Sequence, residues 1–184
     1  GADSVALLMA MLALGYGERL KALHCNFTLR GEESDCDEAF VRELCTKLSV
    51  PLQIRRFNTR RHAEKKGISI EMAARELRYQ WFRSFTEGSE GRKVVAVAHN
   101  ADDQVETLLL NLSMGTGIRG LSGMPFIKQA EGFIRPLQAT PRALILDYLT
   151  ALGQSYREDS SNSDTRYKRN LIRHQLIPLF EELN

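Results

Sequence analysis

Lys93-Val-Val-Ala-Val-Ala-His99 is the stretch that decides the fold. A continuous apolar run of this length, bounded by polar residues, is typical of a strand that helices cover on both faces in a parallel sheet. After it, Val105, Leu108, Leu109 and Leu112 follow at helical spacing before Gly115. The segment is therefore predicted to be a strand that passes directly into a helix.

The same alternation extends outward in both directions. Ser34 and Asp37 have the spacing of a capping box, and Thr140-Pro141 is predicted to open a helix as its cap and first residue. The predicted helices span 5–14, 34–48, 70–85, 105–112, 141–153 and 178–183, and the predicted strands span 20–27, 51–57 and 93–99, with a hairpin over 124–134. This order predicts an α/β fold with a Rossmann-like, doubly wound parallel sheet, helices on both faces and a small helical tail at 137–184.

Composition and charge limit the classes of protein to which this chain can belong. The 184 residues have a net charge of only +2 and are expected to form one domain. Of the 25 cations 18 are arginine, which favours phosphate binding or is simple compositional bias. Cys25, Cys36 and Cys45 form no Cys-x-x-Cys pair, which indicates reduced thiols in a cytoplasmic protein, and no apolar run is long enough for a membrane span.

The polar segment after the central strand is the strongest candidate site. Asp102, Asp103 and Glu106 place three carboxylates within about one turn, beside His99 and Asn100. Such a cluster can hold a divalent cation or an ammonium group. The alternative is that acids near a helix N-terminus are stabilised by the helix dipole and only cap the helix.

Basic residues gather in three places along the chain. Arg75 and Arg78, three residues apart, share one helix face. A stripe with an excess of five positive charges could bind nucleic-acid phosphates or form a solvated edge; it contains Arg55, Arg56, Arg60, Arg61, Lys65 and Lys66. A second patch near the end of the chain contains Arg166, Lys168, Arg169 and Arg173.

Two nucleotide-binding patterns are excluded. Gly115-Thr-Gly-Ile-Arg-Gly120 has the spelling of a dinucleotide fingerprint, but a helix precedes it where that fingerprint needs a strand. A tight loop is expected there instead. The sequence also contains no Gly-Lys dipeptide, so the Walker-type phosphate loop is absent.

Several motifs, in order, resemble one family over essentially the whole chain. Gly1-Ala-Asp-Ser4 is similar to the last four residues of the Ser-Gly-Gly-x-Asp-Ser loop of the N-type ATP pyrophosphatases, or PP-loop proteins, which have the adenine nucleotide alpha hydrolase-like fold. The complete series resembles the catalytic domain of the tRNA-isoleucine lysidine synthetases. It continues through 24–35, 71–79, 99–107, 115–124, 135–137 and Asp159-Ser-Ser-Asn162 to Arg169-Asn-Leu-Ile-Arg173.

The resemblance implies a ligase reaction on an isoleucine tRNA with a CAU anticodon. The wobble cytidine attacks the α-phosphate of ATP and releases pyrophosphate, and L-lysine then displaces AMP. By the same resemblance Gly1, Ala2, Asp3 and Ser4 bind ATP, and Asp3 and Asp103 hold Mg²⁺. Catalytic roles fall to Asp103 and Glu106, toward the lysine ammonium or the metal, and to Arg75 and Arg78, toward phosphate or the polarised cytidine.

The sequence departs from this family at both ends. The leading Ser-Gly and its preceding strand are absent, so we expect weak ATP binding or a gap in the sheet. Because the family's C-terminal tRNA-binding domains do not follow residue 184, this chain is expected to bind tRNA weakly, and tight binding in a filter assay would contradict that. Three other hypotheses remain: a tRNA thiolase, a non-catalytic ATP sensor and a general RNA-binding protein. The oligomeric state is not predicted.

Overall fold

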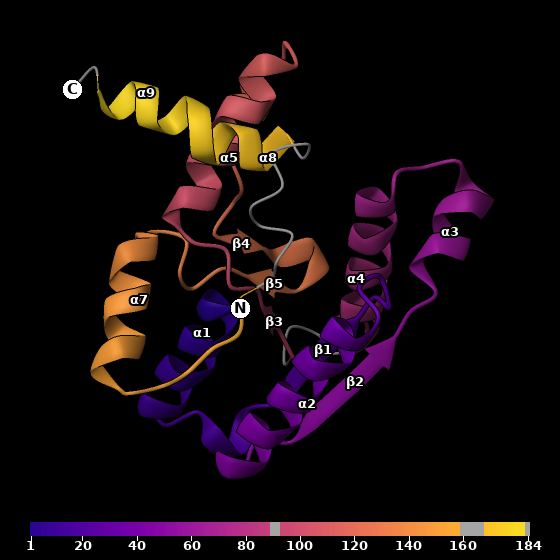
Figure 1. Cartoon of the computed structure of the whole chain (residues 1–184), viewed down its shortest axis with the longest axis vertical. Coiled ribbons are helices and arrows are strands. Elements are labelled where there is room, and N and C mark those ends of the chain that lie inside the picture. The colour runs from indigo at the N-terminus through magenta and orange to yellow at the C-terminus, as the bar shows by residue number, and fades with distance from the viewer. Residues whose placement is uncertain (89–92, 159–167, 183–184) are drawn as a thin grey trace. The chain divides into compact units, whose positions relative to one another are not determined.

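The chain folds into two compact units of mixed helix and strand. The structure, a computed structural model, describes residues 1–88, 93–158 and 168–182 (Figure 1). One unit combines Gly1–Leu7 with Ala96–Asn184, and the other comprises Leu8–Val95. Helix α1 (Ala2–Ala13) begins in the first unit and continues into the second. No helix in the described ranges combines the length and the apolar character needed to cross a membrane.

The Leu8–Val95 unit is built on two parallel strands. β1 (Ala22–Asn26) pairs with β2 (Leu52–Arg56) along their full length, and helix α2 (Glu32–Lys47) packs against β1. Helices α3 (Thr59–Lys66) and α4 (Ile70–Thr86) pack against each other. An aromatic cluster links the strand ends to α4: the rings of Phe27 and Phe57 stack at 5.6 Å, and Trp81 meets Phe57 edge-on at 6.1 Å.

The other unit contains most of the remaining helices and a small three-stranded sheet, whose first strand begins at Val95, the last residue of the Leu8–Val95 unit. Its strand order is β3–β5–β4, and β4 and β5 form an antiparallel hairpin. Phe133, Ile145 and Leu149 are its largest fully buried apolar side chains. The elements are β3 (Val95–Ala96), α5 (Ala101–Ser113), α6 (Ile118–Leu121), β4 (Ile127–Lys128), β5 (Phe133–Ile134), α7 (Arg142–Ala151), α8 (Lys168–Leu171), a π-helical turn (Ile172–Leu176) and α9 (Ile177–Glu181).

Most predicted elements are present, and the α/β class is confirmed. The strands lie in two sheets. The strand predicted over 93–99 is present only at Val95–Ala96, and Val94 is 52% exposed, so the prediction that this whole run is covered on both faces is wrong. The predicted capping box at Ser34 is wrong, because α2 already begins at Glu32 after Gly31, and the Ser34 hydroxyl instead accepts a hydrogen bond from the Arg30 amide at 3.2 Å. Pro141 is the cap of α7 rather than its first residue. Helix α3 was not predicted, since its eight residues are almost all polar.

A buried carboxylate ties β1, β2 and α2 together. Glu38 is 4% exposed and accepts hydrogen bonds of 2.9 Å from each of three side chains: Asn26, Arg42 and Arg56. Burial alone would raise the pKa of Glu38, but these three donors outweigh it and lower the pKa to about 2. The Glu38 carboxylate therefore stabilises the fold at every pH at which it is ionised.

We predict that Glu38→Gln lowers the free energy of unfolding by about 1–2 kcal/mol at neutral pH. The cost stays below that of a fully buried pair because Arg42 and Arg56 are more than half exposed. Since the folded-state pKa lies below the ordinary 4.5, the difference from wild type disappears as the pH falls from about 4.5 to about 2. Urea unfolding across this range measures it, with exposed Glu43→Gln on the same helix as control. A pH-independent difference would contradict the assignment.

Candidate active site at the start of helices α1 and α5

The polar segment after β3 starts helix α5 with a reciprocal cap. The Asn100 side-chain oxygen accepts a hydrogen bond from the Asp103 amide at 2.9 Å, and an Asp103 carboxylate oxygen accepts one from the Asn100 amide at 3.0 Å. This capping box explains why the sequence folds into a helix at this point. It also fixes the Asp103 carboxylate at the helix N-terminus.

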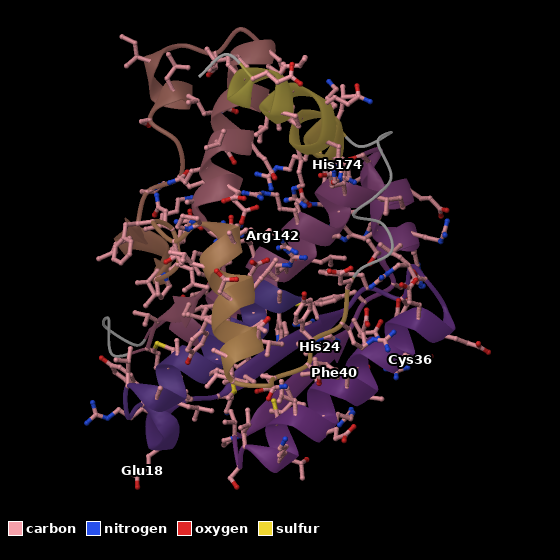
Figure 2. The ribbon with its side chains drawn as sticks, turned by 60° about the vertical axis from the view of Figure 1, so that its left-hand side comes forward. Glu18, His24, Cys36, Phe40, Arg142 and His174 are labelled. Carbon is pink, nitrogen blue, oxygen red and sulfur yellow. The ribbon has the colours of Figure 1, made fainter. Side chains whose placement is uncertain are left out.

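Asp3 in the first turn of α1 joins this cluster. One Asp3 oxygen accepts a hydrogen bond from the Asn100 side-chain amide at 3.1 Å, and the other accepts one from Arg142 at 2.9 Å. Arg142 (Figure 2) lies at the start of α7, where its backbone N–H donates to Asp102 at 3.1 Å. Asp3, Asp102 and Asp103 thus meet at the beginnings of three helices.

Glu106 lies one turn further along α5 and is buried. It is 1% exposed, and its Oε1 accepts a hydrogen bond from the Nε of Arg173 at 2.5 Å. Its Oε2 has no hydrogen-bond partner among the described residues. Burial raises the pKa of Glu106, and the hydrogen bond and charge of Arg173 only partly oppose this rise. Glu106 is therefore a buried acid with one oxygen that no described residue uses as an acceptor.

The remaining charges of the cluster offset one another. Burial raises the pKa of Asp103, while the Asn100 amide and the charges of Arg169 and Arg173 oppose the rise. The Arg173 guanidinium lies 4.0 Å from an Asp103 oxygen, and Arg169 donates to the Thr107 hydroxyl at 2.7 Å. The C-terminal arginines therefore neutralise the acids of α5.

The donor set fits a phosphate-bound magnesium ion better than a metal held by protein alone. Within the described ranges no group of three or more His, Cys, Asp or Glu side chains has metal-binding geometry. Mg²⁺ commonly takes one or two carboxylates and completes its shell with water and substrate phosphates. Asp3 and Asp103, both connected to Asn100, provide such a pair of carboxylates.

The structure brings together only part of the predicted site. Asp3, Asp103 and Glu106 share one network, and Gly1, Ala2 and Ser4 lie at the start of α1. Arg75 and Arg78 lie on α4 in the other unit, with their guanidinium groups over the rings of Tyr79 at 5.0 Å and Phe27 at 5.2 Å, respectively. The motif 159–162 and Arg166 fall outside the described residues.

Sequence reasoning missed two contributors to the site. It gave no role to Arg142 and noted Asn100 only as a neighbour of the acids. The signal for Asn100 was present, because Asn is a preferred cap residue and Asp103 stands three positions later. Arg142 had no such signal, since 139 residues separate it from its partner Asp3.

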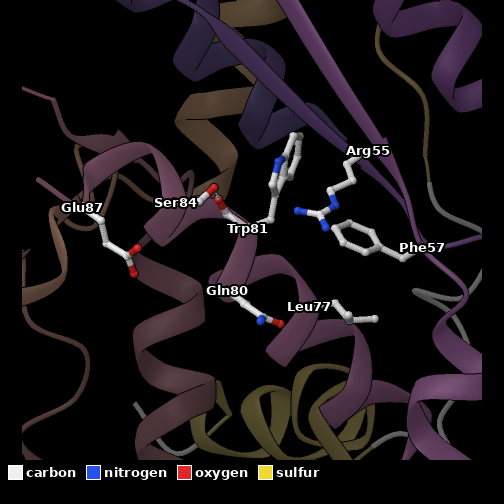
Figure 3. A pocket seen from close by; sticks show the side chains of 7 residues that line it. All are labelled: Arg55, Phe57, Leu77, Gln80, Trp81, Ser84 and Glu87. Carbon is white, nitrogen blue, oxygen red and sulfur yellow. Dashed lines mark hydrogen bonds between the residues drawn. The ribbon is translucent and has the colours of Figure 1, made fainter. Parts of the chain in front are cut away.

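Several side chains of the basic stripe predicted over 55–66 already contact other residues of the chain. Arg56 binds Glu38 and Asp35, Lys66 binds Glu76, and Arg55 lies over the Phe57 ring. Arg55 and Phe57 also line a cavity of about 280 Å³ together with Leu77, Gln80, Trp81, Ser84 and Glu87 (Figure 3). The stripe therefore has fewer cations available for phosphate than its sequence suggests.

Comparison with known proteins places this geometry in a family. A family model described as a PP-loop domain matches residues 1–180. The chain belongs to the PP-loop domain family. In this PP-loop domain the fragment Gly1–Ser4 and the acids of α5 lie in one network, so the recognised loop fragment and the candidate site coincide.

Relatives over the whole chain carry one name. The chain is 54% identical to a tRNA(Ile)-lysidine synthase of Porphyromonas gingivalis, of which it covers 40%, and 52% identical to one of Bacteroides thetaiotaomicron, of which it covers 42%. It is 41% identical to one of Chlorobaculum tepidum. The PP-loop domain thus spans about two fifths of the length of the first two of these relatives.

A solved structure supports the fold. A U34-tRNA thiolase from Methanococcus maripaludis, determined with its [4Fe-4S] cluster, superposes with a TM-score of 0.65 over 86% of this chain and 56% of its own. The two sequences are 19% identical. At that identity the likeness concerns the PP-loop fold and not the chemistry.

We predict that Glu106→Gln changes the pH dependence of stability. Because the folded-state pKa of Glu106 is raised, the wild-type chain loses stability as the pH rises above about 4.5, and a neutral amide does not. The stability of the variant relative to wild type should therefore increase with pH over this range. Urea unfolding at a series of pH values tests this, with exposed Glu18→Gln as control. A relative stability that falls with pH would refute it.

Proposed function

We propose that this PP-loop domain is the catalytic part of a tRNA(Ile)-lysidine synthase. It uses ATP and Mg²⁺ to adenylate the wobble cytidine of an isoleucine tRNA with a CAU anticodon, and it then attaches L-lysine, with AMP as the leaving group. The observation that carries the proposal is the network of Asp3, Asn100 and Asp103, which Arg173 extends to the buried Glu106, so that the PP-loop fragment and the acids of α5 are joined. The names of the 54% and 52% identical relatives support it.

The start of α1 supplies the nucleotide end of the site. Backbone N–H groups at a helix N-terminus bind phosphate, because they lack partners within the helix and carry the positive end of its dipole. Gly1, Ala2 and Ser4 therefore contact the phosphates of ATP, and Ser4 is exposed. Asp3 and Asp103 hold Mg²⁺, which offsets the negative charge of the departing pyrophosphate.

The start of α5 supplies the lysine end. An ammonium group needs hydrogen-bond acceptors, and the Oε2 of Glu106, which has no partner among the described residues, is a buried acceptor whose charge is opposite to that of the ammonium group. Arg173 holds the other oxygen of the same carboxylate, which fixes the direction in which Oε2 points. Glu106, with Asp103, therefore binds the side-chain amine of lysine. After the ammonium group gives one proton to the Glu106 carboxylate, whose raised pKa suits it as the acceptor, the free amine forms the new C–N bond to the cytidine as the C–O bond to AMP breaks.

The resemblance to the family also suggests catalytic roles for Arg75 and Arg78, which lie in the Leu8–Val95 unit. Both guanidinium groups lie over aromatic rings, which orients a cation while leaving donors at its edge. A fixed cation near a phosphate or the polarised base lowers the barrier, because it is already in place when negative charge develops.

We expect Arg78→Met to lower kcat more than it raises KM for ATP in steady-state assays.

The alternative activities have less support. Cys25 is half-buried, and burial raises the pKa of its thiol to about 11, which disfavours the reactive thiolate. In the described parts of the chain no cysteine belongs to a metal-binding group, which argues against an iron–sulfur thiolase. A sensor that only binds ATP would leave the buried acceptor of Glu106 without a purpose.

The decisive experiment follows two products in the full-length gene product. Pyrophosphate release from ATP and Mg²⁺, and labelled lysine entering an isoleucine tRNA transcript, should both occur. Asp103→Asn should reduce lysine incorporation at least about a hundredfold, as loss of a charged group at a reacting centre commonly does. Asp147→Asn, an exposed acid on α7, should not change it.

The outcomes separate the candidate functions. Pyrophosphate release without lysine incorporation would favour thiolation or another base activation. ATP binding without release would favour the sensor. Equal incorporation by Asp103→Asn and wild type would remove Asp103 from the machinery.

A further inference from the structure

Asn100 does more than cap a helix. Its side-chain oxygen accepts from the Asp103 amide, while its side-chain nitrogen donates to Asp3 on a different helix. At 2% exposure the side chain has no access to bulk water, so its orientation is set by these two contacts. We infer that Asn100 is a positioning residue that holds Asp3 in register with Asp103, and so orients the acid that binds magnesium–ATP. This rests on the proposed function.

The choice of residue supports the inference. Asn, Asp and Ser cap helices about equally well. Only Asn can accept from the Asp103 amide and donate to Asp3 at the same time, since ionised Asp has no donor and Ser is too short to replace both amide groups. Capping of α5 therefore does not account for the second contact.

Asp3 is held from both sides. Its second oxygen accepts from Arg142, whose own backbone N–H donates to Asp102. The Ala101 amide donates to the Thr140 carbonyl at 3.0 Å, so the starts of α5 and α7 are also joined through their backbones. Asn100 and Arg142, the two side-chain donors to Asp3, are thus held by helix starts that are bonded to each other.

This arrangement leaves part of Asp3 available. A carboxylate has about four acceptor directions, and Asn100 and Arg142 each occupy one. The remaining directions suit a metal ion or its bound water. With a carboxylate oriented before the ligand arrives, less rotational freedom is lost on binding.

Two variants separate positioning from capping. Asn100→Ser keeps a helix cap but removes the donor to Asp3. Asn100→Asp keeps the cap and the shape but places a second carboxylate about 3.1 Å from Asp3, where like charges repel. The matched control is Asn58→Ser, because Asn58 caps α3 through the Arg61 amide and has no other side-chain hydrogen bond within the described residues.

Equilibrium binding of magnesium–ATP to the full-length protein, alongside thermal unfolding without ligand, is the primary measurement. Asn100→Ser should weaken binding about tenfold, the scale of one charge-assisted hydrogen bond, and Asn100→Asp should weaken it at least as much. Asn58→Ser should leave binding unchanged. If the Asn100 variants lower the melting temperature no more than Asn58→Ser yet lose affinity, positioning is established.

The contrary results are distinct. Wild-type affinity in both Asn100 variants would overturn the inference, as would a loss of affinity in Asn58→Ser of the same size. If Asn100→Ser unfolds, Asn100→Asp and Arg142→Gln decide by the same binding criterion. A wild-type protein that binds magnesium–ATP but never incorporates lysine would refute the proposed function alone, because the comparison of affinities stands without turnover.

Discussion

Burying a carboxylate is costly unless donors satisfy it, and among the described residues each unit contains one such group with a different outcome. Glu38 receives three donors, its pKa is lowered to about 2, and it fastens a helix to two strands. Glu106 is as deeply buried but receives one donor, and its pKa is raised. The satisfied acid is a structural tie. The incompletely satisfied acid, Glu106, is where a cationic ligand could supply the missing hydrogen bond.

The elements were largely predictable because their signals are local. The helical spacing of Leu108, Leu109 and Leu112 needed no distant partner to be recognised, whereas the apolar run at 93–99 forms a strand only at Val95–Ala96. Failures came where the local signal was absent or shared by two structures. Helix α3 has no apolar stripe, and Ser34 has the spacing of a cap but lies inside α2. The predicted hairpin at 124–134 is confirmed as β4 and β5.

The site was only half predictable. Asp103 and Glu106 were predicted as site residues because they cluster beside the end of a strand, and the resemblance to a family added Asp3. Their partners could not be found in this way. Arg142 meets Asp3 across 139 positions and Arg173 meets Glu106 across 67, and arginine at a surface or in a site looks the same in sequence. The sequence shows the C-terminal basic residues only as a second basic patch, whereas two of its arginines, Arg169 and Arg173, contact side chains of α5.

The π-helical turn at Ile172–Leu176 has a consequence for how this site could change. Such a turn holds one residue more than an α-helical turn, and it contains Arg173, the partner of Glu106. Ile172 and Arg173 are neighbours in this turn: the first is buried at 5% exposure, and the second is bonded to Glu106. A change in the packing around Ile172 would therefore be transmitted to the Glu106 carboxylate through the backbone of a single turn.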